Sequence, residues 1–155
     1  MLLTSRTATK DDLDLLAHLA RSARAAAESE RGGAVFLDFD LPPLERFLER
    51  PDAVVVLGEL DGAPLGLALA ELQRPPSGAP PVARIDLIYV EPDARGVGLG
   101  EIIADHVVSW ARDAGARGVD ALVLPGMREG KNFLESAGYV ARLIVMHRPI
   151  ADGRA

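Results

Sequence analysis

The sequence contains no cysteine and only 5% aromatic residues. The lack of cysteine excludes a disulfide framework, a thiolate metal site and a cysteine nucleophile. The 17 Lys and Arg residues are outnumbered by 23 Asp and Glu residues, so the formal charge of −6 gives no basic surface for nucleic acid or anionic lipid. No apolar run reaches the roughly 20 residues of a membrane-spanning helix, and residues 1–6 lack the layout of a signal peptide. We therefore expect a cytoplasmic protein that binds neither nucleic acid nor a membrane.

What the chain does contain is the composition of one globular domain. Its 155 residues are 48% hydrophobic and 26% charged, and neither an internal repeat nor a long linker divides them. We assign residues 1–150 to this domain and residues 151–155 to a C-terminal tail. The three histidines, His18, His106 and His147, have no partners at metal-ligand spacing, so we expect no metal site.

Hydrophobic periodicity and turn residues predict a series of helices and strands. We expect helices over 10–28, 44–50, 98–114 and 129–137, strands over 2–7, 53–59, 65–72, 82–90, 119–124 and 139–148, and a loop over 34–41. This order predicts an α/β fold in which helices pack around one mixed sheet.

Two of these elements have a predicted orientation. Alternation along the strand over 82–90 places Ala83, Ile85, Leu87 and Tyr89 on one face and Arg84, Asp86, Ile88 and Val90 on the other. Helical spacing over 98–114 predicts an inward stripe of Ile102, Ile103, His106, Val107 and Trp110.

A glycine-rich stretch, Arg95-Gly96-Val97-Gly98-Leu99-Gly100, joins the strand over 82–90 to the helix that follows. The first turn of a helix has unpaired N–H groups and a partial positive charge, and glycine lets an anion approach them. A dinucleotide fingerprint needs a third glycine where this chain has Glu101, and a nucleoside-triphosphate loop needs a lysine that is absent. A different diphosphate, or a plain tight turn, remains compatible with the stretch.

The residues around these glycines resemble a known family. Arg95, Gly98 and Gly100 fill the pattern R/Q-x-x-G-x-G/A, which is motif A of the GNAT superfamily of N-acetyltransferases. The strand over 85–90 is similar to the one that precedes motif A, and residues 132–139 resemble motif B, a short helix that ends in glycine and an aromatic residue.

The resemblance implies a fold and a cofactor site. Residues 1–150 would form a GNAT acetyltransferase domain whose mostly antiparallel mixed sheet is splayed between the fourth and fifth strands, with helices on both faces. Acetyl-CoA would be the co-substrate, with its pantetheine in the splay and its pyrophosphate on the glycine-rich turn. The binding residues that it implies are Ile88, Tyr89, Val90, Arg95, Gly96, Val97, Gly98, Leu99, Gly100, Glu101 and Asn132.

The reaction implied by the resemblance is direct transfer of the acetyl group to a primary amine. Because an ammonium has no lone pair, a base must remove its proton, and Asp86 lies where many family members carry an acid. Alternatively, Asp86 forms an ion pair with Arg84, which would lower its pKa and make it a poor base. Leu134 stands where many members have a tyrosine that serves as the acid, and Tyr139 is expected to pack rather than to replace it.

The acceptor is open between a small-molecule amine and a protein amino group. Glu28, Glu30, Asp38 and Asp40, with Phe36 and Phe39 nearby, would either form an amine-binding wall or a solvated face. An alternative function is a GNAT-like module that binds an acyl-CoA without transferring it, as a sensor or partner subunit, and an unrelated α/β domain is a further alternative. Related proteins are often dimers through late strands, so the apolar run over 143–146 favours a homodimer.

Overall fold

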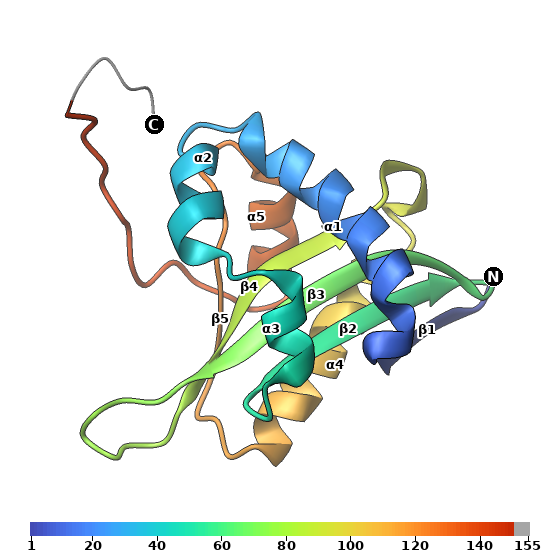
Figure 1. The fold of residues 1–155 in the computed structure, drawn as a ribbon, viewed down its shortest axis with the longest axis horizontal. Helices are drawn as coiled ribbons and strands as arrows, with labels where there is room; N and C mark the ends of the chain where they lie inside the picture. The colour runs from blue at the N-terminus through green and yellow to red at the C-terminus, as the bar shows by residue number, and fades with distance from the viewer. Residues whose placement is uncertain (151–155) are drawn as a thin grey trace.

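The computed structural model describes residues 1–150, so the tail assigned to 151–155 lies outside the described residues. Its centre is one sheet with the strand order β1-β2-β3-β4-β5 (Figure 1). The strands are β1 (Leu3–Thr7), β2 (Ala53–Leu60), β3 (Ala63–Gln73), β4 (Val82–Val90) and β5 (Val119–Ala121). All neighbouring pairs are antiparallel except β4 and β5, which are parallel. The predicted α/β fold with one mixed sheet is confirmed.

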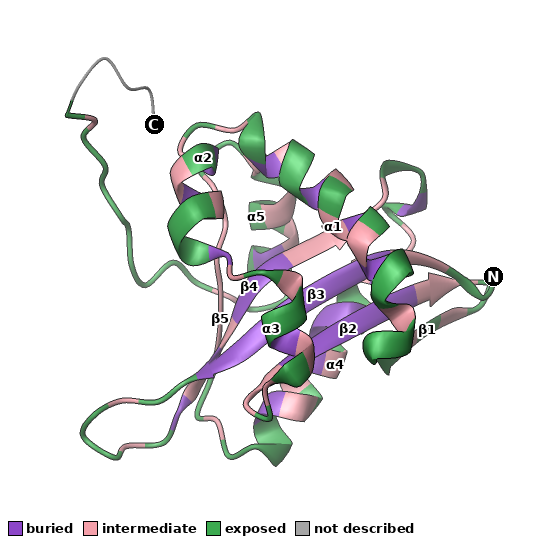
Figure 2. Cartoon of the chain, in the orientation of Figure 1, coloured by how far each residue is buried: buried purple, intermediate pink, exposed green. Residues whose placement is uncertain are grey.

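Helices cover both faces of this sheet. They are η1 (Lys10–Asp12), α1 (Leu13–Glu28), α2 (Gly33–Val35), the π-helical η2 (Phe36–Asp40), α3 (Leu44–Glu49), η3 (Pro92–Ala94), α4 (Leu99–Asp113) and α5 (Arg128–Ser136). Leu16 of α1 and Phe47 of α3 belong to the core on one face, whereas Ile103 and Val107 of α4 belong to the core on the other. Figure 2 shows the middle strands, β2 to β4, as the most buried part of the chain. No helix among the described residues is long and apolar enough to span a bilayer.

The loop predicted over 34–41 is wrong, because most of this stretch is helical in α2 and η2. Its alternation of apolar and acidic residues has no clear helical period. Phe36 and Leu41 are nevertheless 8% and 5% exposed, and both pack into the core beneath α1. Burial of these two side chains stabilises a helix that the local pattern does not show.

A β-bulge interrupts the regular alternation of β4. Leu69 of β3 pairs with Leu87 and Ala70 pairs with Ile85, so Asp86 has no partner residue on β3. Ile85 therefore packs on the α4 side and Leu87 on the α1 side. The prediction that these two residues share a face is wrong, because the extra residue of a bulge resets the alternation.

β4 and β5 pair over only three residues and then separate. The pairs are Ala83–Val119, Arg84–Asp120 and Ile85–Ala121, and the Leu122 N–H adds one hydrogen bond to the Ile85 carbonyl at 3.0 Å. From Asp86 onward, β4 has no pairing with β5 within the described chain. The predicted splay between the fourth and fifth strands is present, and it begins at the bulge.

The strand predicted over 139–148 does not form. No described residue pairs with this stretch, and Figure 1 shows it leaving the body of the molecule after α5. Its contact with the sheet is an ion pair between Arg142 and Asp120 of β5. The apolar pattern is typical of a strand, but a strand also needs a neighbour, and this stretch does not pair with the open edge of β5. The apolar side chains that are left exposed are Val140, Leu143, Ile144, Val145, Met146 and Ile150.

Candidate active site

The glycine-rich turn connects the end of β4 to the start of α4. Gly96 and Gly98 have φ angles of +80° and +98°, in the left-handed region that favours glycine. Within the described chain, the backbone N–H groups of residues 96–101 donate to no hydrogen-bond acceptor, and the Ile102 N–H is the first that is paired. Six consecutive free donors at the positive end of a 15-residue helix form an arrangement that can bind a diphosphate.

The surroundings of the three glycines differ. A Cβ atom built on Gly96 would have no neighbour within 4 Å, whereas one on Gly98 would lie 3.5 Å from Leu3 Cδ1. At Gly100, a Cβ atom would lie 3.5 Å from the Phe133 ring of α5. The turn therefore has free space beside Gly96, whereas at Gly100 it packs against α5. The predicted site residues Val97 and Leu99 are half-buried and buried, while Glu101 is exposed.

The guanidinium group of Arg95 is fixed beside this turn by three contacts. Its Nε donates to the Val90 carbonyl at 2.8 Å, its guanidinium lies 5.5 Å from the centre of the Tyr89 ring, and Nη1 lies 3.5 Å from Glu129 Oε2. Ile88, Tyr89 and Val90 are half-buried and belong to the part of β4 that has left β5. The structure therefore brings the predicted backbone segment, arginine and turn together at one end of the splay. Asn132 is exposed on α5, next to Phe133.

Glu91 and His18, which lie near this end of β4, were not predicted as site residues. The Tyr89 hydroxyl donates to Glu91 Oε2 at 3.3 Å, and His18 Nε2 of α1 lies 3.9 Å from Glu91 Oε1. Burial, together with the neighbouring Glu91 carboxylate, raises the pKa of Tyr89. His18 and Glu91 are far apart in the sequence, so no spacing rule connects them.

Asp86 occupies the bulge and is completely buried. Arg84 Nε donates to its Oδ1 at 2.5 Å, while its Oδ2 is buried with no hydrogen-bond partner among the described residues. Burial raises the pKa of Asp86 to about 8, and the adjacent Glu71 adds to this rise, although Arg84 opposes it. The ion pair with Arg84 exists, but the expected lowering of the pKa does not follow, because desolvation outweighs the attraction.

Asp86 belongs to a cluster of charged side chains, of which Asp86 and Glu71 are buried and Arg50, Asp52 and Arg84 are partly exposed. Glu71 of β3 is 7% exposed, and its Oε1 accepts a hydrogen bond from Arg50 Nη1 at 3.1 Å. Arg50 also binds both carboxylate oxygens of Asp52 at 2.9 Å. Glu71 pairs across the strands with Arg84, whose Nη2 lies 3.7 Å from Glu71 Oε2. Glu71 was not predicted as a site residue, because its neighbours follow only from the register of β3 and β4.

The expected general-acid position carries a hydrocarbon. Leu134 is 5% exposed, and its carbonyl accepts the Tyr139 N–H at 3.0 Å. The Tyr139 hydroxyl is buried without a partner among the described residues, and burial and the charge of Asp105 on α4 raise its pKa. A phenol with a raised pKa donates its proton less readily, which argues against Tyr139 as a substitute for an acid at position 134.

The acidic wall proposed for the acceptor is not assembled as one surface. Phe36 lies in the core, whereas Phe39 is 82% exposed on η2. Glu28, Asp38 and Asp40 are exposed, and Glu30 is half-buried close to Gly126. A cavity of about 440 Å³ lies between α1, η2 and α3, and of the four acids it includes only Asp38.

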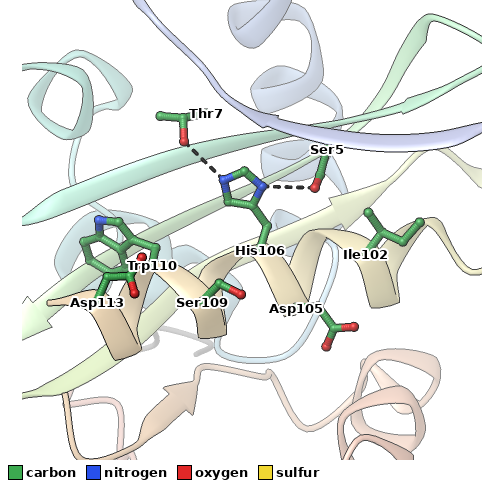
Figure 3. Close-up of a pocket in the computed structure, with 8 residues that line it drawn as sticks. All are labelled: Ser5, Thr7, Ile102, Asp105, His106, Ser109, Trp110 and Asp113. Atoms are coloured by element: carbon green, nitrogen blue, oxygen red, sulfur yellow. Dashed lines mark hydrogen bonds between the residues drawn. The ribbon is translucent and has the colours of Figure 1, made fainter. Parts of the chain in front are cut away.

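A second hollow, of about 510 Å³, lies between β1 and α4 (Figure 3). The two ring nitrogens of His106 form hydrogen bonds with the Ser5 and Thr7 hydroxyls at 3.0 and 3.1 Å, and burial lowers the pKa of His106. β1 is the opposite edge of the sheet from β5. His106 therefore links α4 to β1, far from the splay. Ile102, His106 and Trp110 line this half-exposed hollow, so only Ile103 and Val107 of the predicted inward stripe are fully buried.

No curated protein sequence matches the chain. An aminoglycoside acetyltransferase, meta-AAC0020 from an uncultured soil metagenomic sample, has a TM-score of 0.74 at 18% identity over 96% of this chain and 95% of its own. A ribosomal-protein-alanine N-acetyltransferase from Brucella melitensis has a TM-score of 0.74 at 17% identity, with 97% and 100% covered.

A third structure, the aminoglycoside N-acetyltransferase AAC(6')-Iy in complex with CoA, has a TM-score of 0.75 at 18% identity over 97% of this chain and 95% of its own. At these identities the structures show a shared fold. The sequence model of the acetyltransferase (GNAT) family matches residues 15–139, which is most of the chain. The chain therefore belongs to the GNAT family of acetyltransferases.

Proposed function

We propose that the protein transfers an acetyl group from acetyl-CoA directly to a primary amine. The observation that carries this proposal is the run of six free N–H groups over residues 96–101, at the end of a strand whose neighbouring edge is open. The pyrophosphate binds these N–H groups, with the charge of Arg95 beside it. The pantetheine lies along Ile88, Tyr89 and Val90, and Asn132 approaches it from α5.

The amine must lose its proton before it attacks the thioester. Asp86 has a pKa of about 8, so at mildly alkaline pH its conjugate base is common and much stronger than that of an ordinary aspartate. Because Asp86 is fully buried, the proton reaches it through an intervening water molecule. The leaving thiolate has an ordinary pKa of about 8.5, so it departs without an acid at the Leu134 position.

The acceptor is either a small-molecule amine or a protein amino group. The similar structures include enzymes that act on aminoglycosides and on a ribosomal-protein alanine. These two acceptor types define a first screen, in which an aminoglycoside, a simple diamine and a peptide with a free N-terminus are each incubated with acetyl-CoA. Release of free thiol that depends on both the acceptor and the protein supports the proposal.

Binding and transfer are tested separately. Acetyl-CoA should raise the melting temperature, because only the folded state presents the turn, whereas NADH and ATP should raise it far less. Equal shifts from all three would reflect a general anion effect and contradict the CoA site. A shift with acetyl-CoA but no thiol release from any acceptor would favour the alternative, an acyl-CoA-binding module, which the leucine at position 134 makes a reasonable second candidate.

We further propose that the protein forms a homodimer through residues 140–150. Six apolar side chains of this segment are 74–98% exposed, and β5 has an open edge next to the point where Arg142 contacts it. Pairing of this segment with a second copy would remove both the apolar surface and the open edge from water.

A further inference from the structure

We propose that Glu71 and Asp86 share one proton between Glu71 Oε2 and Asp86 Oδ2, and that Glu71 thereby acts as a positioning residue that sets the proton affinity of the base. The role in catalysis rests on the acetyl transfer proposed above. The shared proton itself rests on the burial, the contacts and the charges of the residues around Asp86, and not on the acetyl transfer.

The first argument is the pairing of the four carboxyl oxygens. Asp86 Oδ1 accepts from Arg84, and Glu71 Oε1 accepts from Arg50. The two remaining oxygens are buried and have no donor among the described residues. Both carboxyl groups also lie at the same guanidinium, because Arg84 Nε donates to Asp86 Oδ1 at 2.5 Å and Arg84 Nη2 lies 3.7 Å from Glu71 Oε2. Two ionised carboxylates cannot form a hydrogen bond, but one proton between them satisfies both oxygens.

The second argument is the balance of charge. Three carboxyl groups, Asp52, Glu71 and Asp86, face two guanidinium groups, Arg50 and Arg84. Arg50 divides its donors between Asp52, bound by Nε and Nη2, and Glu71, bound by Nη1. Full ionisation would leave one negative charge without a partner in a buried place, which is costly. One proton makes the cluster neutral. Arg74, which is exposed to solvent, also acts on Asp52.

The third argument identifies the residue that carries the proton. Asp86 is 0% exposed and has one arginine partner, whereas Glu71 is 7% exposed and lies near both Arg50 and Arg84. Ionisation is therefore easier for Glu71, whose pKa is lowered, and harder for Asp86, whose pKa is raised. The proton is bound to Asp86 and donated to Glu71.

This arrangement gives Glu71 a defined effect on the base. Asp86 can accept a proton only after the shared proton has left to solvent, and the proton that it then takes from the amine restores the pair. In Glu71→Gln, a negative charge disappears and an amide N–H can donate to the ionised Asp86. Both changes favour the carboxylate form, so the pKa of Asp86 should fall by about one unit or more.

The test is a titration of the side-chain carboxyl carbons of Asp86 and Glu71 by NMR between pH 5 and 10. In the unmodified protein Asp86 should titrate near pH 8. In Glu71→Gln it should titrate at least about one unit lower, which is a tenfold change in proton affinity. The matched control is Glu59→Gln, which makes the same substitution in an ion pair with Arg6 outside this cluster, and it should leave the pKa of Asp86 unchanged. An Asp86 that is already ionised at pH 6, or one that titrates alike in both variants, would overturn the proposal.

Infrared spectroscopy and the pH profile of acetyl transfer provide two further tests. If Glu71→Gln does not fold, the infrared carbonyl band of a protonated carboxylic acid decides the question. That band should be present at pH 6, lost at pH 9, and absent in Asp86→Asn. The pH profile of acetyl transfer should move to lower pH in Glu71→Gln by the same interval as the NMR titration. A shared proton without any transfer activity would leave this cluster correct and refute the proposed function instead.

Discussion

At the scale of single residues, Asp86 experiences two opposing effects on its carboxyl group. Arg84 attracts the ionised form, and complete burial disfavours it more strongly. We expect Asp86→Asn to reduce acetyl transfer roughly 100-fold, the usual effect of losing a positioned base, and to leave acetyl-CoA binding almost unchanged. Raising the pH should partly restore the variant, because more of the amine is then neutral. Thiol release and calorimetric binding measure the two effects, and full activity in the variant would remove Asp86 from the mechanism.

The same residue makes stability depend on pH. The pKa of Asp86 is higher in the folded state than its ordinary value of 3.8, so the folded state binds this proton more tightly than the unfolded chain. The resulting stabilisation is complete below about pH 3.8 and is lost as the pH rises through about 8. The melting temperature should therefore fall between pH 5 and 8 and level off above pH 8, and it should fall less in Asp86→Asn. The exposed carboxylate of Asp113 provides a control, since Asp113→Asn should keep the slope of the unmodified protein. Equal slopes in all three proteins would contradict the buried proton.

At the scale of elements, α4 has a left-handed glycine close to each end. Gly96 and Gly115 both have φ of +80°, and a Cβ atom on either would have no neighbour within 4 Å. Alanine at either position introduces the same backbone strain, about 1–2 kcal/mol. Only Gly96→Ala should also weaken CoA binding, by tenfold or more, which is about 1.4 kcal/mol. Calorimetric titration of the two variants measures this difference, and equal affinities would count against the diphosphate site at the turn.

The elements also show which features of the fold the sequence could predict. α4 and α5 follow from helical spacing and their glycine ends, and the turn between β4 and α4 follows from residues 95–100 alone. The bulge at Asp86 could not be predicted, because it depends on which β3 residues lie opposite. For the same reason, the sequence could not show that Glu71 and Asp86 both contact Arg84. The strand predicted over 139–148 had the right pattern, but a strand is defined by its neighbour and not by its pattern alone.

At the scale of the whole molecule, the exposed segment over 140–150 predicts self-association. The protein should elute with twice the monomer mass in size-exclusion chromatography with light scattering. Replacement of Leu143 and Val145 by serine should shift it towards the monomer, because both side chains are exposed and apolar. Phe39→Ser is the matched control, since Phe39 is 82% exposed but lies on η2. A monomer in the unmodified protein would refute the proposed dimer.

The short ladder between β4 and β5 has a consequence for local opening of the sheet. Three residue pairs hold β5, so its amide hydrogens should exchange with deuterated solvent much faster than those of β2 and β3 in the middle of the sheet. A pantetheine arm in the splay would lie beside β4, where a strand is missing, and would connect β4 to β5 beyond their three paired residues. Acetyl-CoA should then slow deuterium uptake across residues 119–122, several residues away from the diphosphate. In this view the ligand acts as a removable sixth strand, and the sheet is complete only while the ligand is bound.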